Sequence, residues 1–308
     1  MRRVKFVSVA VLYVSASCLC AADDPAVSFR VAADTVEIQI GDIAVASYVF
    51  EDPEILRPYF AHVKTIDGQQ VTRNHPPRKS DRKDHATMHP GIWLAFGDVN
   101  GHDFWRNKAR VEHVEFVQKP SAEKNVGSFV ERKRYVASDG EVVCEEEFRF
   151  AIRAAKESYV LYLESQFSHD QEFYFGDQEE MGLGVRVTTS ISQIEGGRLR
   201  DSHGRKGAKK IWSQSAEWCD YSGLVNGRAA GIAVLTHPAN FRTSWWHARN
   251  YGLLAANAFG RAAMQKGKPD RTVVKPGESF RLRYAAWVHG DVDKSQISDR
   301  YQAYSALR

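Results

Sequence analysis

Apolar and polar residues alternate with a period of two along most of this chain. The pattern is clearest in Val36–Ile40 and extends in part over Ile43–Phe50. The same alternation, rich in Val, Phe, Tyr, Ala and charged residues, returns in segments 110–118, 128–136, 141–152, 159–167, 231–236, 253–256 and 280–288. Because successive side chains of a strand point to opposite faces, this pattern predicts half-buried β-strands.

Turn and helix signals fit between these strands. Asp139-Gly140 predicts a hairpin turn, and Pro276-Gly277 predicts a turn before the last long strand. Helical periodicity is convincing only over Lys294–Leu307, with a cap near Asp293. Many long strands without alternating helices predict an all-β fold, a large two-sheet antiparallel β-sandwich with a short C-terminal helix. At this length we expect a supersandwich, similar in fold to the galactose-mutarotase-like proteins.

The N-terminus predicts export. A basic start, an apolar run over Phe6–Ala16 and small residues up to Ala22 have the order of a secretory signal peptide. We therefore expect a signal peptide at residues 1–22 and a single β-sandwich domain at residues 23–308, located in the periplasm or outside the cell. Lipidation at Cys18 is an alternative way of processing the same signal. No later stretch has the roughly 18 consecutive apolar residues that a transmembrane helix needs.

Charge and cysteine content narrow the partners. The 42 basic and 38 acidic residues are interspersed, so the sequence does not predict a nucleic-acid-binding protein. The densest basic run, Arg198–Lys210, contains two glycines and is interpreted as a mobile surface loop rather than a polyanion site. Cys144 and Cys219 remain after signal removal and are expected to pack as small apolar residues. A single disulfide between them is the alternative.

Histidine, aspartate and tryptophan are concentrated in segments 84–93 and 96–108. We expect these segments to form loops over the sandwich, where side chains are free of strand pairing and are often functional. His85 and His89 are candidates for proton transfer, and Arg106 is a candidate for substrate binding. A purely structural role, in which these side chains bind one another and loop amides, is the competing interpretation.

The same histidines raise the question of a metal. His85, His89 and a carboxylate such as Asp84 are ligand types that zinc accepts, so a metal-dependent enzyme is a third hypothesis. The spacing alone is a weak signal, because Pro90 argues against a shared helix face. The sequence identifies no cofactor.

A second polar and aromatic segment runs over His237–Arg261. Indoles beside Arg, Asn and His suit a sugar, since aromatic faces stack on its C–H side and planar polar groups bind its hydroxyls. From this segment we expect His237, Trp246 and Asn257 to bind substrate and His247 to transfer protons. Alternatively, neighbouring Trp245 and Trp246 alternate and one of them is buried.

Two carboxylates lie between these segments. If the chain is extended at Glu179 and Glu180, they point in opposite directions and only one can enter a given pocket. We expect Glu180 to be the catalytic one, with Arg186 as its partner and as a substrate-binding residue. The alternative is a charged surface turn.

Several of these segments resemble a family of exported bacterial proteins that carries the label "methane oxygenase PmoA". The resemblance rests on Asp84-His85, Met88–Trp93, Phe96–Asp98, Asp103–Lys108 and His237-Pro238 to Arg261. Members of that family look like companions of carbohydrate-degradation systems, which implies a sugar-directed role. A membrane methane monooxygenase subunit needs several transmembrane helices, and a mean hydropathy of −0.43 argues against that function.

The sequence therefore predicts an exported carbohydrate-active enzyme that acts on a glycoside or sugar derivative by general acid/base chemistry. Hydrolysis, elimination and epimerisation all need a positioned acid and base, so the sequence does not separate them. The expected partner is a small-molecule or oligosaccharide substrate. A non-catalytic carbohydrate-binding protein is the alternative. The enzyme hypothesis requires segments 84–108 and 237–261 to meet at one site.

Overall fold

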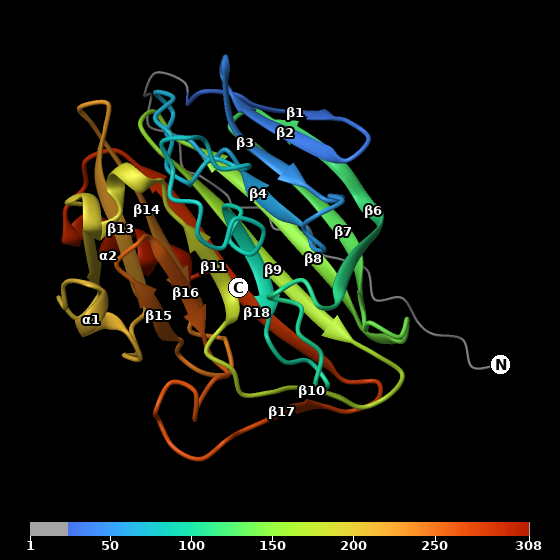
Figure 1. The fold of residues 1–308 in the computed structure, drawn as a ribbon. Coiled ribbons are helices and arrows are strands. Elements are labelled where there is room, and N and C mark those ends of the chain that lie inside the picture. Colours follow the sequence, from blue (N-terminus) through green and yellow to red (C-terminus); the bar gives the residue numbers. More distant parts are fainter. Residues whose placement is uncertain (1–23, 308) are drawn as a thin grey trace.

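Two large antiparallel β-sheets pack face to face in the computed structural model, which describes residues 24–307 (Figure 1). The predicted all-β, two-sheet antiparallel sandwich is confirmed. The predicted signal peptide and Cys18 lie outside the described residues. No described helix is long and apolar enough to cross a membrane.

Sheet I contains eight strands in the order β1-β2-β3-β4-β5-β11-β16-β15. Its strands are β1 (Val27–Val31), β2 (Thr35–Ile40), β3 (Ile43–Val49), β4 (Tyr59–Ala61), β5 (Ile92–Phe96), β11 (Met181–Arg186), β15 (Trp245–Arg249) and β16 (Leu253–Asn257). The long connection between β4 and β5 carries residues 84–91, the first part of the histidine-rich region 84–108. Strand β5 also lies in this region, which is therefore not all loop.

Sheet II also contains eight strands, in the order β12-β13-β14-β18-β9-β8-β7-β6. Its strands are β6 (Arg110–Glu123), β7 (Val126–Val136), β8 (Val142–Ala154), β9 (Tyr159–Ser168), β12 (Arg198–Asp201), β13 (Trp218–Val225), β14 (Arg228–Thr236) and β18 (Ser279–His289). Hairpins join β6 through β9 in chain order, which is why each long alternating segment pairs with the next.

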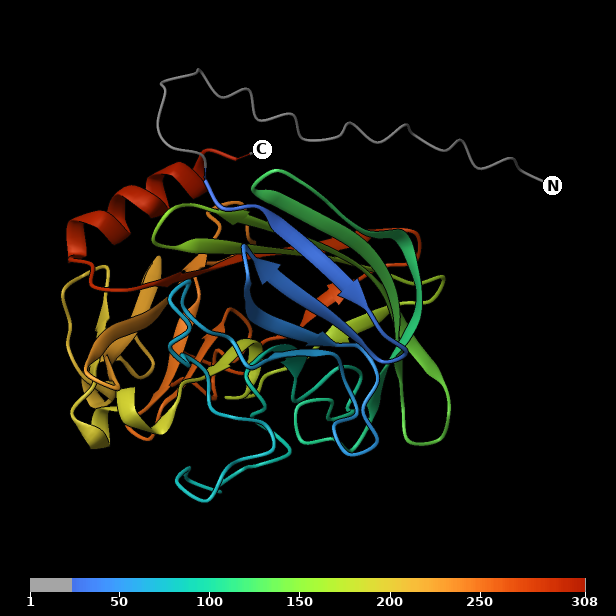
Figure 2. The same ribbon diagram turned by 90° about the horizontal axis from the view of Figure 1, so that it is seen from above.

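The remaining elements lie at the edges. They are the small sheet β10 (Phe173–Phe175) with β17 (Thr272–Val274), the 3-10 turns η1 (Thr189–Ile191) and η2 (Gln193–Glu195), and the helices α1 (Ala208–Ile211) and α2 (Lys294–Ser305). A capping box starts α2, since Asp293 accepts from the Gln296 backbone N–H and the Gln296 side chain returns to Asp293 N. Helix α2 covers the outer face of sheet II, on the opposite side of the molecule from the β4–β5 connection (Figure 2).

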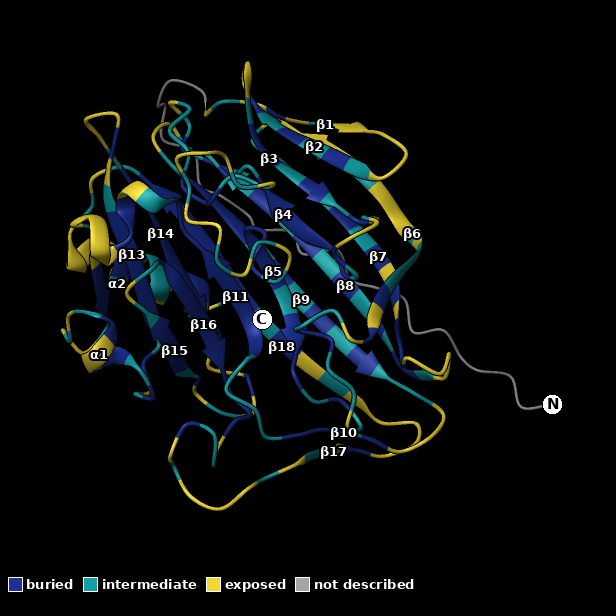
Figure 3. Cartoon of the chain, viewed as in Figure 1, coloured by how far each residue is buried: buried dark blue, intermediate teal, exposed yellow. Residues whose placement is uncertain are grey.

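Aliphatic and aromatic side chains from both sheets fill the space between them. Strands β11 and β16 are buried along their whole length, whereas the edge strand β6 is largely exposed (Figure 3). A second, smaller cluster, which includes Trp93 and Trp105, lies on the outer face of sheet I, so that face is covered rather than open to water.

Charged side chains also lie between the sheets, on the inward face of β7 and β8. Glu131 binds the Tyr48 hydroxyl and lies 2.7 Å from His113 Nδ1. Lys133 lies 3.2 Å from Glu146, which also accepts a 3.1 Å hydrogen bond from Tyr135. Buried charges are tolerated when each is paired, as here.

The basic run Arg198–Lys210 is not the surface loop that the sequence predicts. It begins with strand β12, in which Leu199 and Asp201 are buried, and it ends in α1. Arg200 lies 2.8 Å from the buried carboxylate of Asp220 on β13, so part of the charge serves the fold. The glycines suggested a loop, but strand pairing with β13 decides the structure.

Both described cysteines, Cys144 and Cys219, are buried and free. Burial is the largest cause that raises the pKa of each thiol well above its ordinary value. They pack as small apolar residues, as expected.

Candidate functional site

The outer face of sheet I brings the two polar segments together. Across neighbouring strands, His247 pairs with Ala255, Ala255 with Gly184 and Gly184 with Trp93. Gly184 is required here, because a Cβ at this position would lie 2.5 Å from the Trp93 ring. The two small central residues leave room for larger side chains above the sheet.

Two buried arginines fix the connection between β4 and β5. Arg57 donates to backbone oxygens of Met88 and Trp105, the latter at 2.9 Å. Arg73 donates to the backbone oxygens of Asp84 at 2.6 Å and His89 at 2.9 Å. Each guanidinium satisfies several loop carbonyls at once, so this connection is held in one conformation.

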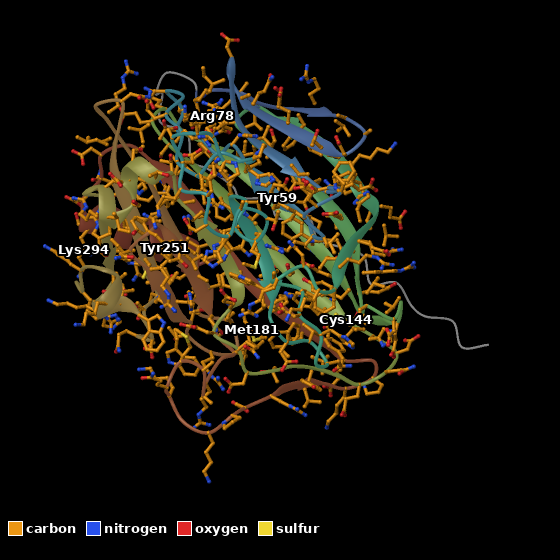
Figure 4. All side chains as sticks on the ribbon, in the orientation of Figure 1. Tyr59, Arg78, Cys144, Met181, Tyr251 and Lys294 are labelled. Atoms are coloured by element: carbon orange, nitrogen blue, oxygen red, sulfur yellow. The ribbon has the colours of Figure 1, made fainter. Side chains whose placement is uncertain are left out.

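A column of stacked rings rises from Trp93. His89 stacks on Trp93 at 5.2 Å between ring centroids, and His85 stacks on His89 at 4.9 Å. His85 also lies 6.0 Å from Tyr251, whose other neighbour is the Arg186 guanidinium at 4.5 Å. Tyr251, labelled in Figure 4, is in the turn after β15, so the column joins the two polar segments directly.

His89 is fully buried, yet neither of its ring nitrogens has a hydrogen-bond partner among residues 24–307. The indole nitrogens of Trp93 and Trp105, both in contact with the His89 ring, are unpartnered in the same way. Burial lowers the pKa of His89 well below its ordinary value, and Arg186 adds to the effect. His89 is therefore neutral at physiological pH and offers one donor and one acceptor.

Arg186 binds Asp84, not Glu180 as the sequence suggested. Its Nη1 lies 2.8 Å from an Asp84 carboxylate oxygen. Burial alone would raise the pKa of Asp84, but the hydrogen bond and charge of Arg186 outweigh it and lower that pKa strongly. Glu180 instead pairs with Arg106, which also lies 3.0 Å from Asp103.

Glu179 is the most highly coordinated carboxylate of the site. Its Oε1 accepts from Arg249 at 2.6 Å and from the Trp212 indole N–H at 2.7 Å, and lies 3.0 Å from His247 Nδ1. Burial would raise the pKa of Glu179, but the contacts with His247, Trp212 and Arg249 outweigh it and lower the pKa to about 2. Glu179 is a permanent anion at neutral pH.

We expected Glu180, and not Glu179, to be catalytic because an extended chain would let only one of the two carboxylates enter the site. The chain bends at these two residues, so both carboxylates face the site. Trp212 and Arg249 were also missed. Arg249 follows His247 by two residues on β15, so strand alternation could have placed both on one face.

Three predicted substrate-binding residues do not reach the site. Trp246 points into the core between the sheets and donates its indole N–H to the Ala216 carbonyl, so Trp245 is the indole on the outer face. Asn257 uses its amide to bind the backbone at Glu179. His237 instead contacts the C-terminal part of the chain, where its Nε2 lies 3.0 Å from the backbone oxygen of Leu307.

An open hollow of about 360 Å³ adjoins Glu179 at the edge of sheet I. It is lined by Gln193, Ala208, Lys209, Trp212, Ala248, Arg249 and Asn250. Trp212 and Arg249 belong to both features, since they bind Glu179 and also line the hollow. An aromatic ring, two amides and two cations make a polar wall suited to hydroxyl-rich ligands.

The described residues 24–307 do not provide the set of ligands that the metal hypothesis requires. Within residues 24–307, no three His, Cys, Asp or Glu side chains lie close enough to hold an ion together. His85 and His89 stack ring on ring, and the nearest carboxylate to His85, Asp84, is already engaged by Arg186.

Solved structures with a similar chain path include a galactose mutarotase-like protein from Clostridium acetobutylicum, with 9% identity over 87% of this chain and 99% of that chain, at a TM-score of 0.45. A galactose 1-epimerase from Lactobacillus acidophilus has 9% identity over 88% of this chain and 100% of that chain, with a TM-score of 0.43. A GH36 α-galactosidase from Geobacillus stearothermophilus has 12% identity over 86% of this chain and 41% of that chain, with a TM-score of 0.44. At these scores the similarities do not bear on function.

Family membership comes from the sequence. A comparison with curated proteins found no match. One family model, described as "Family of unknown function (DUF6807)", matches residues 35–302, which is most of the chain. The chain therefore belongs to this family of unknown function.

Proposed function

We propose that this chain is an exported carbohydrate-active enzyme that acts on a glycoside or sugar derivative by general acid/base catalysis. Export rests on the N-terminal sequence, and the catalytic site is the outer face of sheet I. The proposal covers hydrolysis, elimination and epimerisation, since each needs a positioned acid and base. The resemblance to the exported family with carbohydrate-degrading companions agrees with a sugar substrate.

The observation that carries the proposal is the contact of His247 with Glu179, the carboxylate that also binds Trp212 and Arg249 in the wall of the hollow. Glu179 Oε1 lies 3.0 Å from His247 Nδ1, and this ring nitrogen has no other partner among the described residues. A carboxylate at one ring nitrogen fixes the ring and leaves the other nitrogen to exchange protons. Because Glu179 stays ionised, it orients and stabilises the imidazolium rather than acting as the acid.

The surrounding side chains suit a sugar. Trp212 offers an aromatic face at the hollow, and its ring is fixed by the bond to Glu179. Asn250 and Gln193 offer planar amides on the same wall. Aromatic stacking together with amide and guanidinium hydrogen bonds is how proteins recognise the two sides of a pyranose. Glu180, held by Arg106, adds a second carboxylate on this face.

The test is turnover. The purified chain is incubated with diverse glycosides and oxidised glycosides, and products are detected by mass spectrometry. We expect His247→Gln to lower turnover by about 10²–10⁴-fold, the usual contribution of a general acid or base. His237→Gln is the matched control, because His237 binds the Leu307 oxygen far from the site.

Two outcomes would contradict the enzyme proposal. If no substrate turns over but sugars still bind, and binding survives His247→Gln, the chain is a carbohydrate-binding protein. If His237→Gln and His247→Gln lower turnover equally, the loss comes from folding and the role of His247 is wrong.

A further inference from the structure

The hollow beside Glu179 carries an unbalanced charge. Lys209 and Arg249 are its two cations, and none of its lining residues is a carboxylate. The nearest carboxylate partner, Glu179, is shared among Arg249, Trp212 and His247. Lys209 is exposed and forms no ion pair with any residue between 24 and 307. The wall of the hollow is therefore positive.

The surroundings extend this positive region. Lys206 and Lys210 are exposed neighbours of Lys209, and neither forms an ion pair within the described part of the chain. The acidic residue of the same segment, Asp201, is fully buried and is engaged by Arg205 at 2.5 Å. The structure uses Arg200 and Arg205 to hold the fold, but it gives these three lysines no structural partner.

The uncharged part of the wall is already oriented. The Gln193 side-chain oxygen accepts from the Ala208 backbone N–H at 2.8 Å, so the amide N–H₂ remains as a donor. The Trp212 ring is fixed through its N–H, with the Arg249 guanidinium 5.9 Å from its centroid. A ligand would meet an aromatic face next to donors and cations, with few acceptors.

We propose that this hollow binds an acidic saccharide, with a carboxylate or sulfate group placed between Lys209 and Arg249. The inference rests on the proposed function, because it takes the hollow as the sugar-binding part of that site, and it adds the substrate class. Arg249 contributes the part of its guanidinium that Glu179 leaves free, and Lys209 contributes a mobile ammonium group. Trp212 stacks against the sugar ring.

The experiment compares matched sugars on the full purified chain by isothermal titration calorimetry. The probes are a galacturonic acid trisaccharide, the neutral galactose trisaccharide and a sulfated galactose trisaccharide, so that carboxylate and sulfate are separate arms. One charge-assisted contact corresponds to about tenfold or more in affinity, so we expect at least one acidic probe to bind that much more tightly than the neutral one. The preference should shrink in about 0.5 M NaCl, where exposed charges are screened.

Lys209→Gln should remove most of the preference for the acidic probe, measured as the ratio of its affinity to that of the neutral sugar. Lys156→Gln, an exposed lysine in the turn between β8 and β9, is the matched control. Equal binding of acidic and neutral sugars would overturn the inference and leave the proposed function standing. Equal losses in the two lysine variants would overturn it too, whereas binding of no sugar at all would remove both proposals.

Discussion

His89 and His289 are both completely buried, but they differ in the hydrogen bonds that their ring nitrogens make to other described residues. His289, on the outer face of sheet II, has both ring nitrogens engaged, Nε2 by Asp220 at 2.9 Å and Nδ1 by the Gly290 carbonyl at 2.9 Å. His89, above the outer face of sheet I, has neither nitrogen engaged by residues 24–307. Each ring lies against a tryptophan, Trp287 and Trp93 respectively.

The difference separates stability from function. Asp220 gathers His289, Arg200 and Ser222 into a closed network beneath the start of α2. Every charge in this network has a partner, so we interpret its role as stabilising the fold. The unpartnered nitrogens around His89 cost folding energy, and a protein tolerates such groups mainly where a ligand or water completes them. The first network should therefore respond to mutation in stability, and the second in binding.

The largest expected effect is on the closed network. Asp220→Ala leaves the buried Arg200 guanidinium without a carboxylate and the His289 ring without its partner, and breaking a buried pair in this way costs about 3–5 kcal/mol of unfolding free energy. Urea unfolding followed by circular dichroism measures the loss. The control is Arg228→Gln, which breaks an exposed pair with Asp67 and should cost less than about 1 kcal/mol. Equal losses would show that the network is not structural.

An intermediate effect is expected where the rings cover sheet I. Gly184→Ala would place a Cβ 2.5 Å from the Trp93 ring and 2.9 Å from the Trp105 ring. Overpacking of this kind costs about 1–3 kcal/mol. Gly290→Ala, where the nearest other atom would be 3.7 Å away, should change stability by less than about 0.5 kcal/mol. Thermal unfolding distinguishes them, and a neutral Gly184→Ala would show that the ring cover is loose.

A smaller effect is expected at His89 itself. His89→Phe keeps a flat ring and removes two unpartnered polar atoms, a change that is close to neutral when no bond is lost. We expect unfolding free energy to change by less than about 1 kcal/mol. A loss as large as that of Asp220→Ala would mean that protein partners of His89 exist and that the comparison fails.

The pH dependence sharpens the same comparison. Burial, then Arg186, lowers the pKa of His89 below its ordinary value of 6.5, so below pH 6.5 the unfolded chain binds a proton that the folded chain does not. Stability contributed by His89 is therefore present above pH 6.5 and lost as pH falls. Wild type should lose up to about 1.4 kcal/mol per pH unit more than His89→Phe in this range. Parallel curves from pH 6.5 to 5 would contradict the shift.

Strand alternation was enough to predict the sandwich because its signal is local. Segment 142–152 alternates between buried and partly exposed positions and lies in β8, and segment 280–288 lies in β18, although that strand is buried on both faces from Tyr284 onward. The helix α2 was predictable for the same reason, since Asp293 marks its start. The prediction of a loop at Arg198–Lys210 was wrong because β12 forms by pairing with β13, a strand that lies further along the chain and is not visible in the local sequence pattern.

The site was predicted in its segments more than in its residues. Composition located His85, His89, Arg106 and His247 in segments that the structure does bring together. It could not assign Glu179 to His247 or Asp84 to Arg186, because those pairs join positions about 70 and 102 residues apart. Nor could it place Trp246 inward, since neighbouring tryptophans look alike until strand direction is known.

The paired charges inside β7 also bear on how the chain finds its strand alignment. Glu131 and Lys133 point inward, while Arg132 and Arg134 point outward, so polarity alone does not tell the strand which way to face. Hydrophobic contrast, the usual guard against a slip of one residue, is weak over these four positions. Recognition between Lys133 and Glu146, directly opposite on β8, supplies that guard instead. A shift of one residue between β7 and β8 would separate Lys133 from Glu146 and leave both charges buried without a partner, so this pair favours the observed register of the hairpin.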